Sequence, residues 1–167
     1  MKDHPTISRM PGGFTLVELM TVIAILSVLA AVAYPLINAS LPKYRLRAAA
    51  RELVIDFKRA KVEAIKRHQN VLIEFKPPSG TDGGSYELCV DDCTTGEKIA
   101  SVAMPKDVRL TPNPDKNKYF NDNKRGKYDS RGLPPNLSDT GTICLSTTDG
   151  SRTYSIALSS SGAVRMY

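Results

Sequence analysis

The chain has 167 residues, with 23 Lys and Arg against 17 Asp and Glu, a formal net charge of +6, and no Trp. This length allows one ordinary domain with a modest core and excludes a second domain of ordinary size. With 41% hydrophobic residues, the composition is that of a globular protein and excludes a disordered one.

The positive charge is concentrated in one segment. Residues 43–67 hold nine basic and three acidic side chains, which equals the whole surplus of +6. Residues 68–167 hold twelve of each kind. Because the surplus belongs to a single expected helix, it is weak evidence for a nucleic-acid-binding protein.

An apolar run begins directly after Gly12-Gly13 and carries one carboxylate, that of Glu18. The 19 residues from Leu19 to Ile37 carry no charge. As a helix they span about 28 Å, which matches the hydrocarbon core of a bilayer. A lone acid in such a segment costs about 2.5–3.5 kcal/mol at mid-membrane depth, so Glu18 requires a partner.

The first 13 residues are polar and mildly basic. In an ordinary secretory signal the small residues follow the apolar core, whereas here Gly12 and Gly13 precede it. Cleavage after Gly13 would keep the apolar segment and give Phe14 a free ammonium. Because Phe14 and Glu18 are one helical turn apart, this ammonium can neutralise the carboxylate within one chain or in a staggered neighbour.

The string Gly13-Phe14-Thr15-Leu16-Val17-Glu18-Leu19 resembles the prepilin signature of type IV pilins and type II secretion pseudopilins. The resemblance implies that a prepilin peptidase cleaves after Gly13 on the cytoplasmic side and methylates the nitrogen of Phe14. It implies that Glu18 sets the stagger of subunits and that the N-terminal helix packs on other pilins. An inner-membrane assembly platform is a further implied partner, and the implied location is the bacterial inner membrane, single-pass, with a periplasmic head.

The charges that flank the span predict the opposite orientation. Four basic residues lie within 43–51 and two lie within 1–13, so the positive-inside rule places the head in the cytoplasm. We follow the prepilin motif because it fixes the side on which the peptidase acts. An uncleaved signal anchor with an interfacial Glu18 is the alternative. The basic residues after the span can also contact the headgroups of anionic membrane lipids.

The helix is expected to continue beyond the span. Pro35 and Pro42 each remove a backbone hydrogen bond and are expected to kink it. Apolar residues then recur at spacings of four and three, which predicts an amphipathic helix over 43–68 with its stripe against a sheet. The stripe residues are Leu46, Ala50, Leu53, Phe57, Ala60 and Ala64.

After residue 68 the apolar period changes to two, which is typical of strands. We expect strands at 71–75, 86–90, 99–104, 108–110, 143–145, 154–158 and 163–166. The polar stretch 113–139 is expected to be a loop, and Asp149-Gly150 predicts a hairpin turn.

The expected fold is α+β: a long N-terminal helix, transmembrane and then amphipathic, packed on an antiparallel β-sheet head. The resemblance identifies this as the pilin fold. The expected boundaries are 1–13 for the prepilin leader, 14–42 for the hydrophobic assembly helix and 43–167 for the head, with the amphipathic helix at 43–68 and the β head at 70–167.

A narrower resemblance covers the head. It is similar to the GspH/FimT group of minor pilins, which implies a structural subunit that primes or caps filament assembly near the tip. The main prediction is a minor pilin of a type IV pilus, and the alternative is a type II secretion pseudopilin. The matching residues are Ala49-Ala50, Leu53, Ala60, 63–67, Val71, Arg131-Gly132, Ile143, Leu145, Tyr154, Ile156 and 162–165.

A DNA-binding minor pilin for DNA uptake is a further alternative. Pilus members of the group often end in Gly-Arg-x-Arg, a motif linked to DNA, but here Ala163 replaces the first Arg and only Arg165 matches. Residues 106–131 hold eight basic and four acidic side chains with three aromatics, which is compatible with a nucleic-acid surface. A solvated loop with the aromatics folded beneath it is favoured. The candidate DNA contacts are Arg165, Lys124, Arg125 and Lys127.

Three cysteines lie downstream of the apolar run. In a periplasmic head we expect a disulfide between Cys89 and Cys93, with two reduced thiols as the alternative, and Cys144 is left over. A Cys-x3-Cys pair without a further His or Cys cluster is a poor zinc signal. No catalytic triad, glycine-rich phosphate loop or metal-ligand spacing emerges from the sequence, so we expect a non-enzymatic protein without cofactor or metal.

Overall fold

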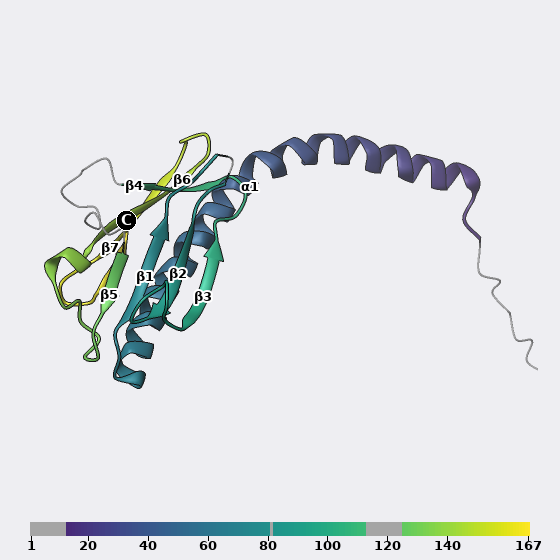
Figure 1. Cartoon of the computed structure of the whole chain (residues 1–167). Helices are drawn as coiled ribbons and strands as arrows, with labels where there is room; N and C mark the ends of the chain where they lie inside the picture. Colours follow the sequence, from purple (N-terminus) through teal and green to yellow (C-terminus); the bar gives the residue numbers. More distant parts are fainter. Residues whose placement is uncertain (1–12, 81, 113–124) are drawn as a thin grey trace, which may run out of the picture. The chain divides into compact units, whose positions relative to one another are not determined.

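The computed structural model describes residues 13–80, 82–112 and 125–167. They form one long helix, α1 (Leu16–Arg67), followed by strands and a short 3-10 helix, as Figure 1 shows. The chain divides into two compact units, Met1–Ala39 and Ser40–Tyr167. The assigned helix continues through Pro35 and Pro42, so neither proline interrupts it, and a kink at either position stays a prediction.

The described strands form two four-stranded sheets in which every pairing is antiparallel. The first sheet has the order β3 (Lys98–Ala103), β2 (Ser85–Val90), β1 (Val71–Lys76), β5 (Arg125–Tyr128). The second has the order β4 (Val108–Pro112), β6 (Gly141–Thr147), β7 (Thr153–Leu158), β8 (Val164–Met166). The expected α+β layout with antiparallel strands is therefore confirmed, and its division into two sheets is an addition.

The expected loop over 113–139 is wrong in part. Strand β5 lies within it and pairs with β1, and the 3-10 helix η1 covers Leu137–Asp139. The sequence of strand β5 is Arg-Gly-Lys-Tyr, in which large apolar residues do not alternate. The strand therefore forms because it pairs with β1, and no local sequence pattern predicts it. Residues 113–124 lie outside the described part of the chain.

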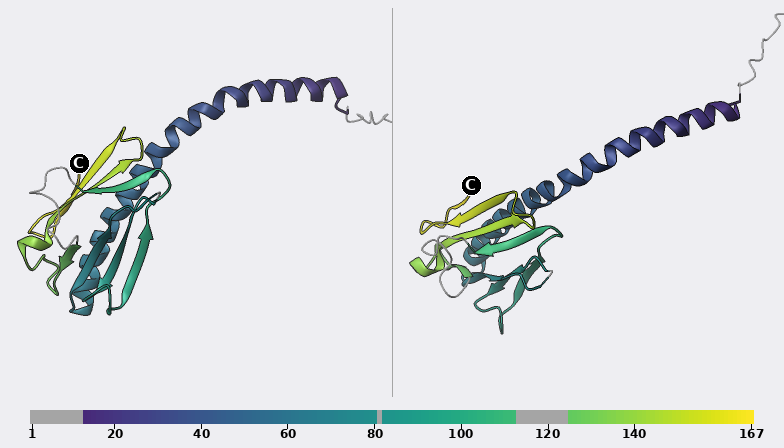
Figure 2. Two further views of the ribbon diagram at one scale, coloured as in Figure 1. Left: turned by 45° about the horizontal axis from the view of Figure 1, so that its top comes forward. Right: turned by 90° about the horizontal axis from the view of Figure 1, so that it is seen from above.

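The core joins the head segment of α1 to both sheets. All six residues of the expected helical stripe are fully buried, which confirms the spacing argument. The rings of Phe57 on α1 and Phe75 on β1 have centroids 6.1 Å apart, and Ile143 and Ile156 bring the second sheet into the same cluster. Figure 2 shows the two groups of strands beside this part of the helix.

Two tight turns agree with the sequence patterns. Gly150 has a φ of 68° and donates its N–H to the carbonyl of Thr147, which confirms the hairpin between β6 and β7. The helix α1 ends at Arg67, and His68 has a φ of 53°, the left-handed conformation that commonly ends a helix.

The turn between β3 and β4 is attached to the helix. Arg45 Nη1 lies 2.7 Å from Asp107 Oδ2, and both side chains are partly exposed. The backbone N–H of Leu110 on β4 donates to the carbonyl of Gly83, which lies just before β2, and this bond links the second sheet to the first. The turn is therefore connected both to α1 and to the first sheet.

Candidate functional site

The segment Leu16–Pro35 of α1 is long and apolar enough to span a membrane. It has 20 residues with a mean hydropathy of 2.5, and none of it is buried by the described residues. Two of its hydroxyl groups are paired within the helix, because Thr21 donates to the carbonyl of Glu18 and Ser27 donates to that of Ile23, both at 2.8 Å. Internal pairing of this kind is what a lipid environment demands of polar groups.

Thr15 caps the first turn of this helix. The backbone N–H of Glu18 donates to Thr15 Oγ1 at 3.2 Å, and that of Leu19 donates to the Thr15 carbonyl at 3.2 Å. Thr-x-x-Glu is the spacing of a capping box, and an acid in the first turn is stabilised by the positive end of the helix dipole. The motif therefore has a local structural role beside any role in assembly. The spacing of Thr15 and Glu18 in the sequence is by itself enough to identify this cap.

The bond between Gly13 and Phe14 lies outside the helix, because α1 begins at Leu16. The Phe14 side chain is 88% exposed, and a Cβ placed on Gly13 would meet nothing within 4 Å. Exposed, non-helical backbone is the kind that proteases reach. In the uncleaved chain Phe14 precedes the helix that contains Glu18, so pairing of its ammonium with that carboxylate stays a prediction that depends on cleavage.

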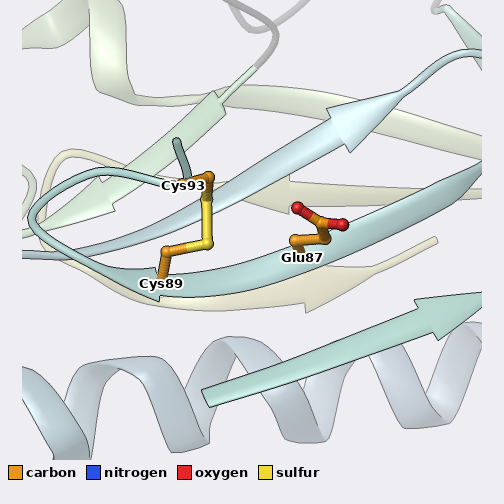
Figure 3. Close-up of side chains that lie close together, drawn as sticks. All are labelled: Glu87, Cys89 and Cys93. Carbon is orange, nitrogen blue, oxygen red and sulfur yellow. A yellow bond between two sulfur atoms is a disulfide. The ribbon is translucent and has the colours of Figure 1, made fainter. Parts of the chain in front are cut away.

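Cys89 and Cys93 form a disulfide, as expected, with their Cα atoms 5.1 Å apart. Figure 3 shows the carboxylate of Glu87 beside it on β2. These three side chains are close enough to share a metal ion, but the two sulfurs are bonded to each other. Lys76 Nζ lies 2.7 Å and Lys98 Nζ 3.3 Å from the carboxylate oxygens of Glu87. The cluster is thus a disulfide next to an ion-pair network.

The electrostatics of this region stabilise its carboxylates in the charged form. The hydrogen bond from Lys76, with help from Lys98, lowers the pKa of Glu87 despite its burial. In the disulfide loop, hydrogen bonds from the hydroxyl and N–H of Thr94 lower the pKa of Asp92. The disulfide loop therefore has its own network of hydrogen bonds. Cys144 does not belong to this loop: it is a buried free thiol whose Sγ lies 3.4 Å from Ser155 Oγ.

The described candidates for DNA contact come from two different sheets. Arg125 and Lys127 lie on β5 and Arg165 lies on β8, which are edge strands of different sheets. Lys124 lies outside the described residues. Tyr128 is fully buried in the core and cannot stack on a base, which agrees with the favoured alternative of aromatics folded beneath the surface. Tyr119 and Phe120 lie outside the described residues, and DNA contact by the basic side chains stays untested.

Two protein families match this sequence. Residues 9–34 match the family described as the prokaryotic N-terminal methylation motif. Residues 49–162, more than half of the chain, match the family described as type II transport protein GspH. The first match coincides with the capped start of α1 and its apolar span, and the second with the head.

Known proteins resemble both parts of the chain. The pilin-like protein PilA1 of Thermus thermophilus is 32% identical over 164 residues, covering 92% of this chain and 97% of the relative. Two solved structures share the fold at low identity. The type IV minor pilin FimU of Pseudomonas aeruginosa has a TM-score of 0.51 at 16% identity over 75% of this chain and 90% of its own. The minor pseudopilin EpsH of Vibrio cholerae has a TM-score of 0.50 at 12% identity, and the match covers 74% of this chain and 96% of EpsH. This chain therefore belongs to the GspH family of pilin-like proteins, structural subunits with a methylation motif at the N-terminus.

Proposed function

We propose that this chain is a minor pilin of a type IV pilus, a structural, non-enzymatic subunit that primes or caps filament assembly. The observation that carries the proposal is the methylation motif at the start of an exposed apolar helix, followed by a GspH-type head. The pilin-like relative, aligned over nearly the whole chain, supports the pilus. The family description and the EpsH structure favour a secretion pseudopilin as the second candidate.

Processing follows from the residues at the start of α1. A prepilin peptidase cleaves the exposed bond after Gly13 and methylates the nitrogen of Phe14. The mature chain then stays in the inner membrane through Leu16–Pro35, single-pass, with its head in the periplasm. The disulfide between Cys89 and Cys93 supports this side of the membrane, because such bonds persist in oxidising compartments.

Glu18 links membrane storage to assembly. Its carboxylate is costly in lipid and is neutralised by the ammonium of Phe14, first within the chain and then in a staggered neighbour. A register that leaves the carboxylate unpaired is disfavoured, so the pairing aligns subunits as the inner-membrane platform extracts them. Kinks at Pro35 and Pro42 adapt the helix to the filament, where the apolar segment packs on other pilins.

Substitution of Glu18 tests this mechanism. The Glu18→Val variant is expected to be cleaved and methylated normally but to be absent from purified filaments. The matched control is Thr21→Val, which removes another polar group from the same helix without changing the charge. Mass spectrometry of the N-terminus and immunoblots of sheared filaments measure the two steps. Normal incorporation of Glu18→Val would refute the mechanism.

Deletion of the gene separates the candidate functions. A minor pilin predicts loss of surface pili, and a pseudopilin predicts loss of exoprotein secretion with pili intact. Loss of transformation alone, with pili and secretion unchanged, would identify the DNA-uptake role. Each phenotype is restored by the wild-type chain and not by Glu18→Val under the assembly mechanism.

A further inference from the structure

Three side chains with metal-binding atoms lie next to one another on the first sheet: Glu87, Cys89 and Cys93 (Figure 3). Glu87 and Cys89 alternate along β2 with Tyr86 and Leu88, which belong to the core, so Glu87 and Cys89 point away from it. The sulfur of Cys93 reaches the same face, because it is bonded to that of Cys89. The two sulfurs and a carboxylate oxygen lie within 4.8 Å of one another, and all three side chains are buried.

The loop that carries Cys93 is held by contacts besides the disulfide. The backbone N–H of Val90 donates to the carbonyl of Glu97 at 2.9 Å, which closes the loop between β2 and β3. The carboxylate of Glu97 lies 2.7 Å from Nη1 of Arg67, so the loop is also attached to the end of α1. Because these contacts do not involve sulfur, we expect Cys93 to stay close to Cys89 when the S–S bond is broken.

The two cysteines exist as free thiols before the disulfide forms. In the proposed function the head is synthesised in the cytoplasm and then crosses the membrane. The cytoplasm keeps cysteines reduced, and disulfides form in oxidising compartments. Each copy therefore passes through a dithiol state, in which Cys89 and Cys93 carry no S–S bond. The inference rests on the proposed function in this respect.

We propose that in the dithiol state Cys89, Cys93 and Glu87 bind one Zn²⁺ ion, and that the disulfide excludes it. Two thiolates and a carboxylate are ligands that Zn²⁺ accepts in tetrahedral sites, with the fourth position left for water. With Zn–S bonds of about 2.3 Å, a tetrahedral site requires the two sulfurs to lie about 3.8 Å apart. This separation is smaller than the 4.8 Å within which the ligand atoms already lie, so small side-chain movements suffice.

Lys76 and Lys98 balance the charge of such a site. Three negative ligands and a doubly charged cation leave one negative charge, which the ammonium groups of the two lysines offset. Lys76 lies 2.7 Å from Oε1 of Glu87, and Lys98 lies 3.3 Å from Oε2. Because the two lysines contact different oxygens, a metal ion on one oxygen leaves the other hydrogen-bonded. Such second contacts orient a ligating carboxylate.

The set of donor atoms favours Zn²⁺ over other cations. Ca²⁺ and Mg²⁺ prefer sites made of oxygen atoms alone. Cu⁺ prefers soft sulfur ligands, so it gains little from the carboxylate of Glu87. A Cys-x3-Cys pair by itself is a poor zinc signal, and the alternation of β2 adds the third ligand beside it.

Oxidation and metal binding compete for the same two sulfurs. When a disulfide oxidant acts on the site, Cys89 and Cys93 lose two electrons and form the S–S bond. The oxidant's own disulfide accepts these electrons with two protons and becomes two thiols, and the metal ion is released. Bound Zn²⁺ is therefore expected to delay closure of the disulfide.

Metal titration of the reduced full-length chain in detergent tests the proposal. A phosphine breaks the disulfide, and alkylation of a sample confirms that all three cysteines are free thiols. Co²⁺ is the probe, because its complexes with thiolates have a charge-transfer absorption band. The expected band saturates at one Co²⁺ per chain and disappears when Zn²⁺ is added. The untreated chain, which keeps its disulfide, is expected to show no band.

Glu87→Gln is the deciding variant, because it removes the charged ligand and keeps the size of the side chain. It is expected to weaken Co²⁺ binding by about tenfold or more. The matched control is Cys144→Ser, which removes the third thiol and is expected to leave the affinity unchanged. Equal affinity of Glu87→Gln and the wild type would overturn the proposed site, as would loss of the band in Cys144→Ser. A reduced wild type that shows no band, folded or unfolded by circular dichroism, would also overturn it.

The rate of disulfide formation tests the competition. Oxidised glutathione is added to the reduced chain with and without Zn²⁺, and alkylation with mass spectrometry follows the loss of thiols. Zn²⁺ is expected to slow closure by about tenfold. Equal rates would show that the metal does not hold the two thiols.

These outcomes are separate from those of the proposed function. A chain that is absent from filaments refutes the pilus function and leaves the metal titration unchanged. A failed titration refutes the metal site alone.

Discussion

The hydroxyl of Tyr86 donates a 2.6 Å hydrogen bond to Oδ2 of Asp56, across 30 positions of sequence. Tyr86 is fully buried on β2 and Asp56 is 8% exposed on α1. Burial raises the pKa of Tyr86 above its usual range, and the hydrogen bond to Asp56 raises it further. This bond connects the helix to the first sheet at one defined point, and it makes the stability of the head sensitive to both residues.

Loss of the acceptor at position 56 should destabilise the head. Asp56→Ala leaves the Tyr86 hydroxyl buried without its partner, which costs about 1–3 kcal/mol. Asp56→Asn keeps an acceptor and should cost less. Denaturant unfolding of the detergent-solubilised chain measures both. Equal stability of Asp56→Ala and the wild type would show that the bond contributes nothing.

Tyr128 should behave in the opposite way. Its hydroxyl is buried and has no hydrogen-bond partner among the described residues. Tyr128→Phe removes a polar group that gains nothing from burial, so it should be neutral or stabilise by up to about 1 kcal/mol. Tyr86→Phe is the matched control and should destabilise. A clear loss of stability in Tyr128→Phe would indicate a partner for this hydroxyl.

Alkaline pH should weaken the fold through the same two tyrosines. Burial raises the pKa of both Tyr86 and Tyr128 above the ordinary value of 10.0. Above that pH the unfolded chain releases protons that the folded chain retains, so the free energy of unfolding falls as pH rises. The slope for each tyrosine is close to zero below about pH 9 and approaches about 1.4 kcal/mol per pH unit near pH 11. The free energy of unfolding should be measured at several values between about pH 8 and 11, a window that brackets the ordinary tyrosine pKa. Tyr128→Phe should reduce the slope of this free energy against pH. A slope unaffected by that substitution would contradict the account.

The disulfide should stabilise the head modestly, because it closes a loop with a sequence separation of four. In the chain-entropy model a loop this short contributes about 2 kcal/mol, which the pair Cys89→Ser and Cys93→Ser should remove. Cys144 is buried, so an alkylating reagent should reach it only after unfolding. Mass spectrometry should therefore find one modified thiol in denaturant alone and three after reduction.

Gly162 should not tolerate a side chain. Its φ is +70°, and a Cβ there would lie 2.7 Å from the carbonyl oxygen of Gly132, which belongs to a different loop. Gly162→Ala should therefore cost more than the roughly 1–2 kcal/mol of the left-handed conformation alone. Gly150→Ala is the control, because its φ is +68° and its Cβ would meet nothing within 4 Å. Equal losses of unfolding free energy in the two variants would argue against contact between the two loops.

Much of the fold follows from local patterns. The spacing of Leu46, Phe57 and Ala64 predicted the buried side of the helix, and alternation predicted the strands at residues 71 and 86. Strand β5 and the division into two sheets could not be predicted from local patterns. The polar strand Arg125–Tyr128 forms because it pairs with β1, which lies more than fifty residues earlier in the chain.

By itself the sequence determined the class of this protein and its processing motif. The motif residues Gly13, Phe14 and Glu18 are close to one another in the chain, and the apolar run that follows is contiguous. Both features are local in the sequence, so they can be recognised without a tertiary structure. Only the tertiary structure decided that Asp56 meets Tyr86 and that Tyr128 belongs to the core. The physical reason is that burial and hydrogen bonding depend on which distant segments pack together. A periodic pattern of apolar residues predicts that one side of a helix or strand is buried, but it does not identify the segment that covers that side.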